Sequence, residues 1–389
     1  MLKVKITFLT LLILIISPFT LADQISQYKE VLFSKILNEK RTITVQVPES
    51  YGTNKNKKYP VIYRLDGKEN LPLITEVMHK LQKADSAPEI IMVAIENTDR
   101  ARDFAPTVNR DPRGPVGQGG GADKFLDFLE QELIPYINNK YQTHDFKVIS
   151  GASVAGLFTI HSLQSRPHLF QAHMAYSPAV WWGDRTTAKK TKAFMSQAKH
   201  LDNYLYMNIG EEAGEMRAVY DDLHSYLQNN QPKKFKLVSN EFNNVPHGLT
   251  SAAGVFHAYQ NLFLPLRMPN RELQDGVKSI KDYYTRLSLQ RGEIIAPPEW
   301  VIRELGYYLV NNEEETKALE IFKYNQKLYP ELASAYNGLA YIYERLNRYD
   351  EALKKVNLAL NLAKEGDSGY KVYINRRDRL TVLVSDSIK

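Results

Sequence analysis

The chain has 389 residues, of which 43% are hydrophobic, and its formal net charge is +6 at neutral pH. This length suits two or three domains with sizeable apolar cores, and the mixed charges argue against wholesale disorder. The sequence contains no cysteine, which excludes disulfides, thiolate catalysis and cysteine-held zinc, and it has no dense run of lysine and arginine, so nucleic-acid binding is not expected.

The first 22 residues have the organisation of a secretory signal peptide. Lys3 and Lys5 form a basic head, the stretch 6–19 is apolar, and the small residue Ala22 closes the segment. A membrane anchor is the alternative, but the apolar stretch is shorter than the about 20 residues that a spanning helix needs. Cleavage after Ala22 removes two lysines and no acid, which lowers the formal charge from +6 to +4. We therefore expect a periplasmic or secreted protein that is not attached to a membrane.

Strand-like and helix-like segments alternate between about residues 30 and 265. Period-two alternation predicts a strand at 42–47, and short apolar runs predict buried strands at six further places. These are 59–65, 89–95, 146–150, 172–176, 204–209 and 235–239. Apolar residues at helical spacing predict a helix over 124–137, with Asp123 as its N-cap. The alternation is typical of an α/β fold with a mostly parallel sheet and helices on both faces.

Only helical patterns follow residue 268, and the stretch 299–362 repeats with a period of 34 residues. The first unit carries Leu305, Ala318 and Phe322, and the second carries Leu339, Ala352 and Val356 at the same positions. This period is that of tetratricopeptide repeats. We therefore divide the chain into a signal peptide (1–22), an α/β domain (23–268) and a tetratricopeptide-like helical domain (269–389), which is a candidate surface for a protein partner or for self-association.

One serine lies in a turn of small residues between a predicted strand and a predicted helix. The segment 148–160 reads VISGASVAGLFTI, in which Gly151 precedes Ser153 and Ala155 and Gly156 follow it. Small neighbours are what a strained turn needs to lift a serine hydroxyl above a sheet. The backbone N–H of Val154 would then face a developing oxyanion. The alternative is an inert serine in a tight turn.

A nucleophilic serine needs a base, which in this kind of fold follows an acid in chain order. Nine histidines are present, and His247 is the one in a loop between the last predicted strand and a helix at 250–263. The acid is expected after the strand 204–209, where three glutamates lie. Glu212 is favoured over Glu211 and Glu215, and the alternative is that these glutamates only cap the following helix.

The second oxyanion donor is expected in the loop after the strand 59–65. Gly67 allows close approach of the backbone there, so the N–H of Gly67 or of Lys68 is the candidate. Asp66 is expected to brace this loop rather than to take part in the chemistry.

Six segments together resemble the esterase D superfamily, and within it the enterobactin-esterase-like serine hydrolases. They are Tyr63–Gly67 (YRLDG), Asn97–Arg100 (NTDR), Gly121–Leu126 (GADKFL), Gly151–Gly156 (GASVAG), Ser177–Trp182 (SPAVWW) and Pro246–Gly248 (PHG). The resemblance covers roughly residues 28–266. It implies an α/β-hydrolase fold and a serine esterase that acts on a small-molecule ester without a metal or a cofactor.

Proteins of this kind cleave siderophore lactones, acetyl esters or feruloyl esters, and some transfer acyl groups. Trp181 and Trp182 are candidates to line a pocket for an aromatic acyl or catecholate group. Arg100 is a candidate to meet an anionic substrate, and an ion pair with Asp99 is the alternative. We therefore expect an exported serine esterase that works through an acyl-enzyme. An acyltransferase on the same serine and a non-catalytic binding protein with a partner-recruiting tail are the competing hypotheses.

Overall fold

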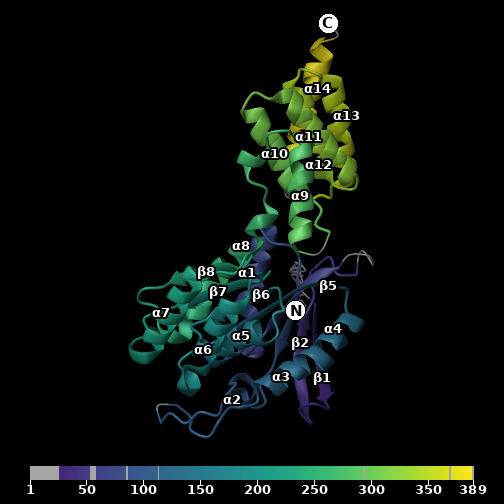
Figure 1. Cartoon of the computed structure of the whole chain (residues 1–389). Helices are drawn as coiled ribbons and strands as arrows, with labels where there is room; N and C mark the ends of the chain where they lie inside the picture. Colours follow the sequence, from purple (N-terminus) through teal and green to yellow (C-terminus); the bar gives the residue numbers. More distant parts are fainter. Residues whose placement is uncertain are drawn as a thin grey trace, which may run out of the picture.

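The computed structural model describes residues 26–52, 58–84, 86–112, 114–291, 294–367 and 369–387. The expected signal peptide, residues 1–22, lies outside these ranges. Figure 1 shows two parts, a sheet covered by helices and a stack of helices that extends from one end of it. None of the described helices is both long enough and apolar enough to cross a membrane.

Eight strands of the described chain form one sheet in the order β1-β2-β4-β3-β5-β6-β7-β8. They are β1 (Gln27–Ser34), β2 (Glu39–Gln46), β3 (Tyr59–Arg64), β4 (Ile91–Ile95), β5 (Thr143–Ala152), β6 (Ala172–Tyr176), β7 (Tyr204–Ile209) and β8 (Lys236–Glu241). β2 runs antiparallel to β1 and β4, whereas all the other neighbours in the sheet are parallel. The mostly parallel sheet confirms the predicted α/β class.

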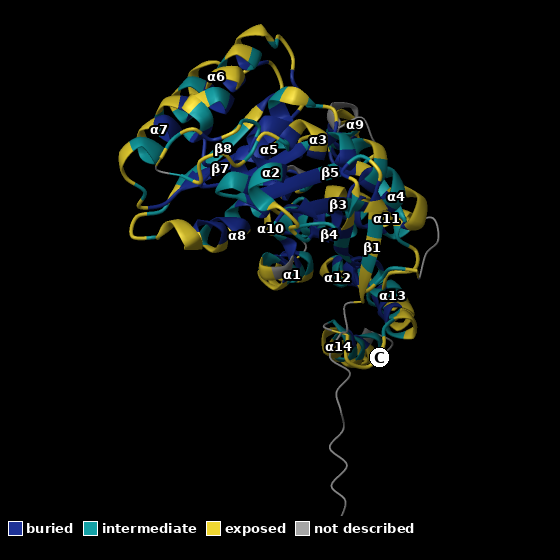
Figure 2. Cartoon of the chain, turned by 90° about the horizontal axis from the view of Figure 1, so that it is seen from below, coloured by how far each residue is buried: buried dark blue, intermediate teal, exposed yellow. Residues whose placement is uncertain are grey.

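The strand at the edge of the sheet, β1, is the one that the sequence pattern does not predict. Lys29 and Glu30 interrupt its apolar residues, so neither a buried run nor a clean alternation is visible. Its outer face is exposed, as Figure 2 shows, and the side chain of Val31 is 61% exposed. In contrast, the apolar runs at 172–176 and 204–209 form β6 and β7 with the predicted bounds.

Helices cover both faces of the sheet. α1 (Gly67–Lys83) and α8 (Thr250–Phe263) pack on one face. The other face carries α3 (Ala122–Phe128), α4 (Ile134–Lys140), α5 (Val154–Ser165), α6 (Trp182–Gln197) and α7 (Gly214–Asn229). Successive strand residues point to opposite faces, so in β3 Ile62 packs with the core of α1 and α8 while Tyr63 packs with that of α3 and α5.

The helix predicted over 124–137 begins earlier and has a different cap. It runs as α3, a π-helical turn η1 (Leu129–Leu133) and α4, and its N-cap is Gly121. Asp123 lies in the first turn, where its carboxylate accepts a 2.7 Å hydrogen bond from Nε2 of the buried His161. The prediction of Asp123 as N-cap is therefore wrong, because the helix already begins at Ala122 and the Asp123 carboxylate contacts a histidine of α5 instead.

The C-terminal part of the described chain consists of helices with their own apolar core. These are α9 (Val277–Arg291), α10 (Glu299–Asn311), α11 (Glu315–Leu328), α12 (Ala333–Arg345), α13 (Tyr349–Leu362) and α14 (Tyr370–Ser387). Ala318 and Ala352, which are equivalent in the 34-residue period, are both fully buried in this core. The ring of Phe322 fits against Gly306 and Gly338, where an added Cβ would lie 2.7 Å from it in each case.

The C-terminal helices are attached at the end of the sheet where its parallel strands begin, which is not the edge formed by β1. Phe263 ends α8, and its ring lies 6.4 Å from that of Phe146, which is near the start of β5. Leu266 packs against both the core beneath α8 and the core of the C-terminal helices. The opposite edge, where the parallel strands end, lies away from these helices (Figure 1).

Candidate active site

Ser153 lies between the end of β5 and the start of α5 in a strained conformation. Its φ is 57° and its ψ is −119°, a backbone shape that a residue with a side chain rarely adopts and that is typical of a nucleophile elbow. A Cβ on Gly151 would lie 2.4 Å from the Ala155 carbonyl oxygen, and one on Gly156 would lie 3.0 Å from the Tyr176 carbonyl oxygen. The small residues of the motif are therefore required by the geometry of the turn.

Val154 and Gly67 are the first residues of two helices that follow neighbouring parallel strands. Val154 begins α5 after β5, and Gly67 begins α1 after β3. The first N–H groups of a helix have no partner within it, and this end of a helix carries partial positive charge. Gly67 also lies close to β4, since a Cβ on it would be 2.5 Å from the Ala94 Cβ. Both predicted oxyanion donors thus lie at the carboxyl edge of the sheet.

The structure brings His247 and Glu212 together at the same edge. Glu212 follows β7, and His247 begins the short 3-10 turn η2 (His247–Leu249) after β8. His247 Nδ1 donates a 2.8 Å hydrogen bond to Glu212 Oε1, and the Glu212 side chain is 6% exposed whereas that of His247 is 41% exposed. Of the other two glutamates considered, Glu215 pairs with Arg185 instead.

Hydrogen bonds keep the carboxyl of Glu212 ionised. Burial alone raises the pKa of Glu212, but hydrogen bonds from Ser177, His247 and the backbone lower it by more, so that the net pKa lies below its usual value. The backbone N–H of Gly210 donates to Oε2 at 2.6 Å, and the Ser177 hydroxyl donates to Oε1. A charged, fixed carboxylate is what holds an imidazole with Nδ1 protonated and Nε2 free to accept a proton.

Ser177 and Asn208 support this pair, and the sequence analysis assigned a role to neither, although it quoted Ser177 within the SPAVWW segment. Ser177 is fully buried with φ 39°, and its N–H donates to Asn208 Oδ1 at 3.0 Å. Asn208 Nδ2 in turn donates to the carbonyl of Thr250, close after His247, at 2.9 Å. The only sequence signal was the Ser-Pro pair directly after a strand.

A chain of contacts connects the serine turn to the histidine. The N–H of Ser153 donates to the carbonyl of Tyr176 at 2.9 Å, and the next residue, Ser177, donates to Glu212. No hydrogen bond joins Ser153 Oγ to the His247 ring within the described chain. Catalytic hydrogen bonds of this type are often long before substrate binds and tighten in the reacting complex.

A cavity of about 640 Å³ lies beside Val154, and its lining includes Arg100, Trp181 and Trp182. Trp182 is 2% exposed and its indole N–H donates to the Thr107 carbonyl at 2.9 Å, so most of this ring belongs to the core. Trp181 is only partly buried, which makes it the tryptophan better placed to meet a ligand.

Arg100 is held by the two segments that flank the site. Its guanidinium forms two 2.8 Å hydrogen bonds with the Asp66 carboxylate and a 3.1 Å hydrogen bond with the carbonyl of Ala152. Asp99 instead caps α2 (Arg100–Phe104) by accepting from the N–H of Arg102 at 3.0 Å. The alternative ion pair of Arg100 with Asp99 is therefore wrong, because Asp66 takes that place.

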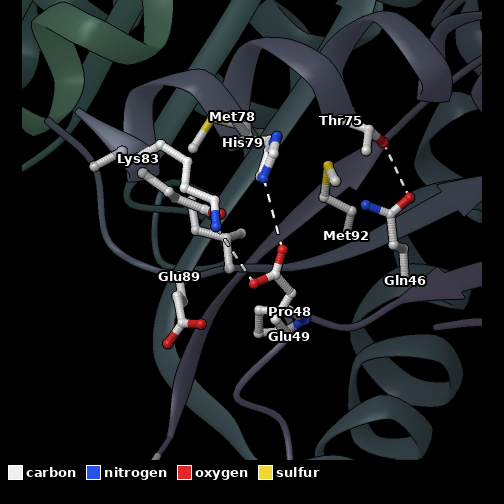
Figure 3. Close-up of a pocket in the computed structure, with 12 residues that line it drawn as sticks. Gln46, Pro48, Glu49, Thr75, Met78, His79, Lys83, Glu89 and Met92 are labelled. Atoms are coloured by element: carbon white, nitrogen blue, oxygen red, sulfur yellow. Dashed lines mark hydrogen bonds and ion pairs between the residues drawn. The ribbon is translucent and has the colours of Figure 1, made fainter. Parts of the chain in front are cut away.

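A separate cavity of about 340 Å³ lies at the opposite end of the strands from Ser153, where the parallel strands begin (Figure 3). It is bounded by the end of β2 at Gln46, by Met92 near the start of β4, and by His79 and Lys83 of α1. His79 Nε2 and Lys83 Nζ both lie 3.6 Å from the Glu49 carboxylate. None of the predicted site residues lines this cavity, so it is distinct from the site at Ser153. Among the described residues, no cluster of His, Asp and Glu is arranged to hold a metal ion.

The sheet order, the serine turn and the histidine after the last strand define the class of α/β hydrolases. Residues 34–252 match the model of the Esterase family, described as "Putative esterase". The match covers more than half of the chain, and the chain belongs to this family.

Individual relatives agree with this assignment. The chain is 32% identical over 204 residues to the ferri-bacillibactin esterase BesA of Bacillus subtilis, a match that covers 48% of this chain and 70% of that protein. It is 27% identical over 166 residues to the siderophore enterobactin esterase of Emericella nidulans, covering 38% of this chain and 55% of that protein. These relatives place the chain among the enzymes that hydrolyse esters.

A solved structure shares the fold. The crystal structure of an IroE-like serine hydrolase from Shewanella oneidensis superposes with a TM-score of 0.68 at 23% identity. The similarity covers 78% of this chain and 100% of that one. It shows that the two chains have the same fold, including more of this chain than the family match covers.

Proposed function

We propose that the chain is an exported serine esterase that acts through Ser153, His247 and Glu212. The observation that carries this proposal is the 2.8 Å hydrogen bond between His247 Nδ1 and Glu212 Oε1, at the sheet edge where the strained serine turn lies. Because the carboxylate holds Nδ1, Nε2 is left to accept the proton of a serine hydroxyl. The family membership supports an ester as the bond that is cleaved.

In the proposed reaction, Ser153 Oγ attacks the ester carbonyl carbon while His247 Nε2 takes the hydroxyl proton. The N–H groups of Val154 and Gly67 stabilise the oxyanion that forms. The carbon–oxygen bond to the alcohol then breaks, the alcohol leaves with the proton from His247, and an acyl ester on Ser153 remains. A water molecule, deprotonated by His247, attacks this ester and releases the carboxylic acid and the free serine.

For the substrate we propose an ester-bonded siderophore or a similarly bulky small molecule. Two curated relatives are named for siderophore esters. The cavity of about 640 Å³ beside Val154 is large enough for part of such a molecule, and the partly exposed ring of Trp181 would stack on an aromatic acyl or catecholate group. The pairing of Arg100 with Asp66 offsets part of the positive charge that an anionic substrate would meet.

The experiment is the hydrolysis of p-nitrophenyl butyrate and of a ferric catecholate trilactone by the purified full-length chain. Ser153→Ala is expected to lower turnover of both by at least about 1,000-fold because no other group replaces the nucleophile. The matched control is Ser165→Ala, which changes an exposed serine at the end of the same helix and is expected to keep wild-type turnover. Undiminished turnover by Ser153→Ala would exclude this mechanism.

The same preparation separates the competing functions. An acyltransferase on Ser153 would pass the acyl group to an added alcohol faster than to water, whereas the proposed hydrolase releases mainly the acid. A non-catalytic binding protein would not be labelled by a fluorophosphonate, which reacts with an activated serine. The family membership favours hydrolysis over acyl transfer, and the paired His247 and Glu212 favour an activated serine over a non-catalytic binding protein.

We also propose that the C-terminal helices form a tetratricopeptide-like surface for self-association or for a protein partner. Leu328 and Leu362, which are equivalent in the 34-residue period, are 40% and 42% exposed at the ends of α11 and α13. Sedimentation of the full-length chain tests self-association, and a Leu328→Glu/Leu362→Glu variant is expected to have a lower mass. If the wild-type chain is a monomer, self-association is excluded and only binding to a different protein remains.

A further inference from the structure

Arg64, the last residue of β3, is a buried cation beneath the carboxyl edge of the sheet. It is 1% exposed. Its Nη1 donates a 2.9 Å hydrogen bond to Ser150 Oγ, and its Nη2 donates a 3.1 Å hydrogen bond to Ser251 Oγ. The centre of the guanidinium lies 5.5 Å from the ring centroid of Tyr176. The sequence placed Arg64 in an apolar strand and in the YRLDG segment, and neither pattern indicated a role for its side chain.

No carboxylate pairs with Arg64 within the described chain. Burial lowers the pKa of its guanidinium, opposed by the nearby Tyr176, Tyr259 and Asp66. Among the described residues of this domain, Arg41 is also fully buried, and it shows the usual solution, with Asp103 at 2.6 Å. A buried charge without an ionic partner is unfavourable for folding, so a requirement other than stability is the better explanation for Arg64.

Arg64 and its two hydrogen-bond partners belong to three of the segments that carry the proposed catalytic groups. Arg64 itself lies three residues before Gly67, Ser150 lies three residues before Ser153, and Ser251 lies four residues after His247. The backbone adds to this connection, because the N–H of Leu65 donates to the Ser150 carbonyl at 2.9 Å. One rigid, planar guanidinium therefore spans the oxyanion loop, the nucleophile strand and the helix after the base.

We propose that Arg64 is a positioning residue of the esterase, whose buried guanidinium fixes the oxyanion loop, the serine turn and the histidine segment relative to one another. Arg64 does not touch the substrate in this proposal and acts through Ser150 and Ser251. The proposal rests on the proposed function of Ser153 and His247. It predicts a loss of turnover rather than of substrate binding, because small displacements of reacting groups slow the chemical step.

The test is steady-state kinetics of the full-length chain with Arg64→Met and Arg64→Lys, measured below the melting temperature of each. Arg64→Met is expected to lower kcat by about 10- to 100-fold with KM changed less than about twofold. Arg64→Lys keeps the charge and one hydroxyl contact and is expected to recover most of kcat. Leu227→Ala, which opens a cavity in the core of α7, is the control for lost stability and is expected to keep kcat.

A milder variant covers the case in which Arg64→Met does not fold. Ser251→Ala removes one hydrogen bond to the charged guanidinium. It is expected to lower kcat by about tenfold, the lower end of the effect of a hydrogen bond to a charged group, with no further loss when combined with Arg64→Lys. Wild-type kcat in folded Arg64→Met, an equal kcat loss in Leu227→Ala, or wild-type kcat in Ser251→Ala would each overturn the proposal. Inactive Ser153→Ala beside fully active Arg64→Met would refute the role of Arg64 alone and leave the esterase function standing.

Discussion

His173 makes folding sensitive to acid, and the size of this effect follows from its burial. It lies in β6 with 0% of its surface exposed. Burial lowers the pKa of His173 from 6.5 to about 3, although a contact with the Tyr204 backbone opposes the change. The histidine therefore stays neutral in the folded protein at pH values where the unfolded chain binds a proton.

The direction and size of the pH dependence follow from these two values. Above pH 6.5 His173 is neutral in both states and has little effect. As the pH falls from 6.5 toward 3, the unfolded state gains a proton that the folded state does not bind, so stability decreases. Between pH 7 and pH 5 this histidine alone lowers the free energy of unfolding by about 2 kcal/mol.

The measurement is urea unfolding at pH 7 and pH 5, followed by circular dichroism. In His173→Gln the loss of stability between the two pH values is expected to be smaller than in the wild type by about 2 kcal/mol. His200→Gln changes an exposed histidine and is expected to keep the wild-type loss. If His173→Gln and the wild type lose the same free energy, the reasoning from burial is refuted.

Two further predictions concern the site itself. Glu212→Gln is expected to lower kcat by about 1,000- to 10,000-fold with little change in KM, because Nδ1 of His247 loses its charged acceptor; steady-state rates that fall less than tenfold would contradict this. Gly151→Ala is expected to lower both the melting temperature and the activity, because the new Cβ would lie 2.4 Å from the Ala155 carbonyl oxygen; calorimetry that shows an unchanged melting temperature would contradict the required clash.

Local patterns predict most of the fold because its central strands are short and fully buried. The runs at 172–176 and 204–209 have no polar face, so the apolar stretch and the strand coincide. β1 has no such apolar stretch, because an edge strand tolerates charged residues such as Lys29 and Glu30, whose partners lie on other elements. Asp123 looks like a cap in isolation, and only the folded position of His161 shows otherwise.

Some residues of the candidate site can be predicted from their local sequence, whereas others depend on contacts with distant parts of the chain. The turn at Ser153 is visible in the sequence because it requires small neighbours, and the chain order of the fold points to the loop of His247. The choice of Glu212 among three nearby glutamates, by contrast, depends on which side chain the fold turns toward His247. Ser177 and Arg64 could not be found because their partners are brought to them by other strands.

The place where the C-terminal helices join the sheet has a practical consequence. Because these helices start at the end of α8 beside Phe146, and the proposed catalytic groups follow the other ends of the strands, α14 lies away from the proposed site (Figure 1). Immobilising the protein on a bead through a tag after α14 is therefore expected to leave the approach of a bulky ester to the proposed site unobstructed.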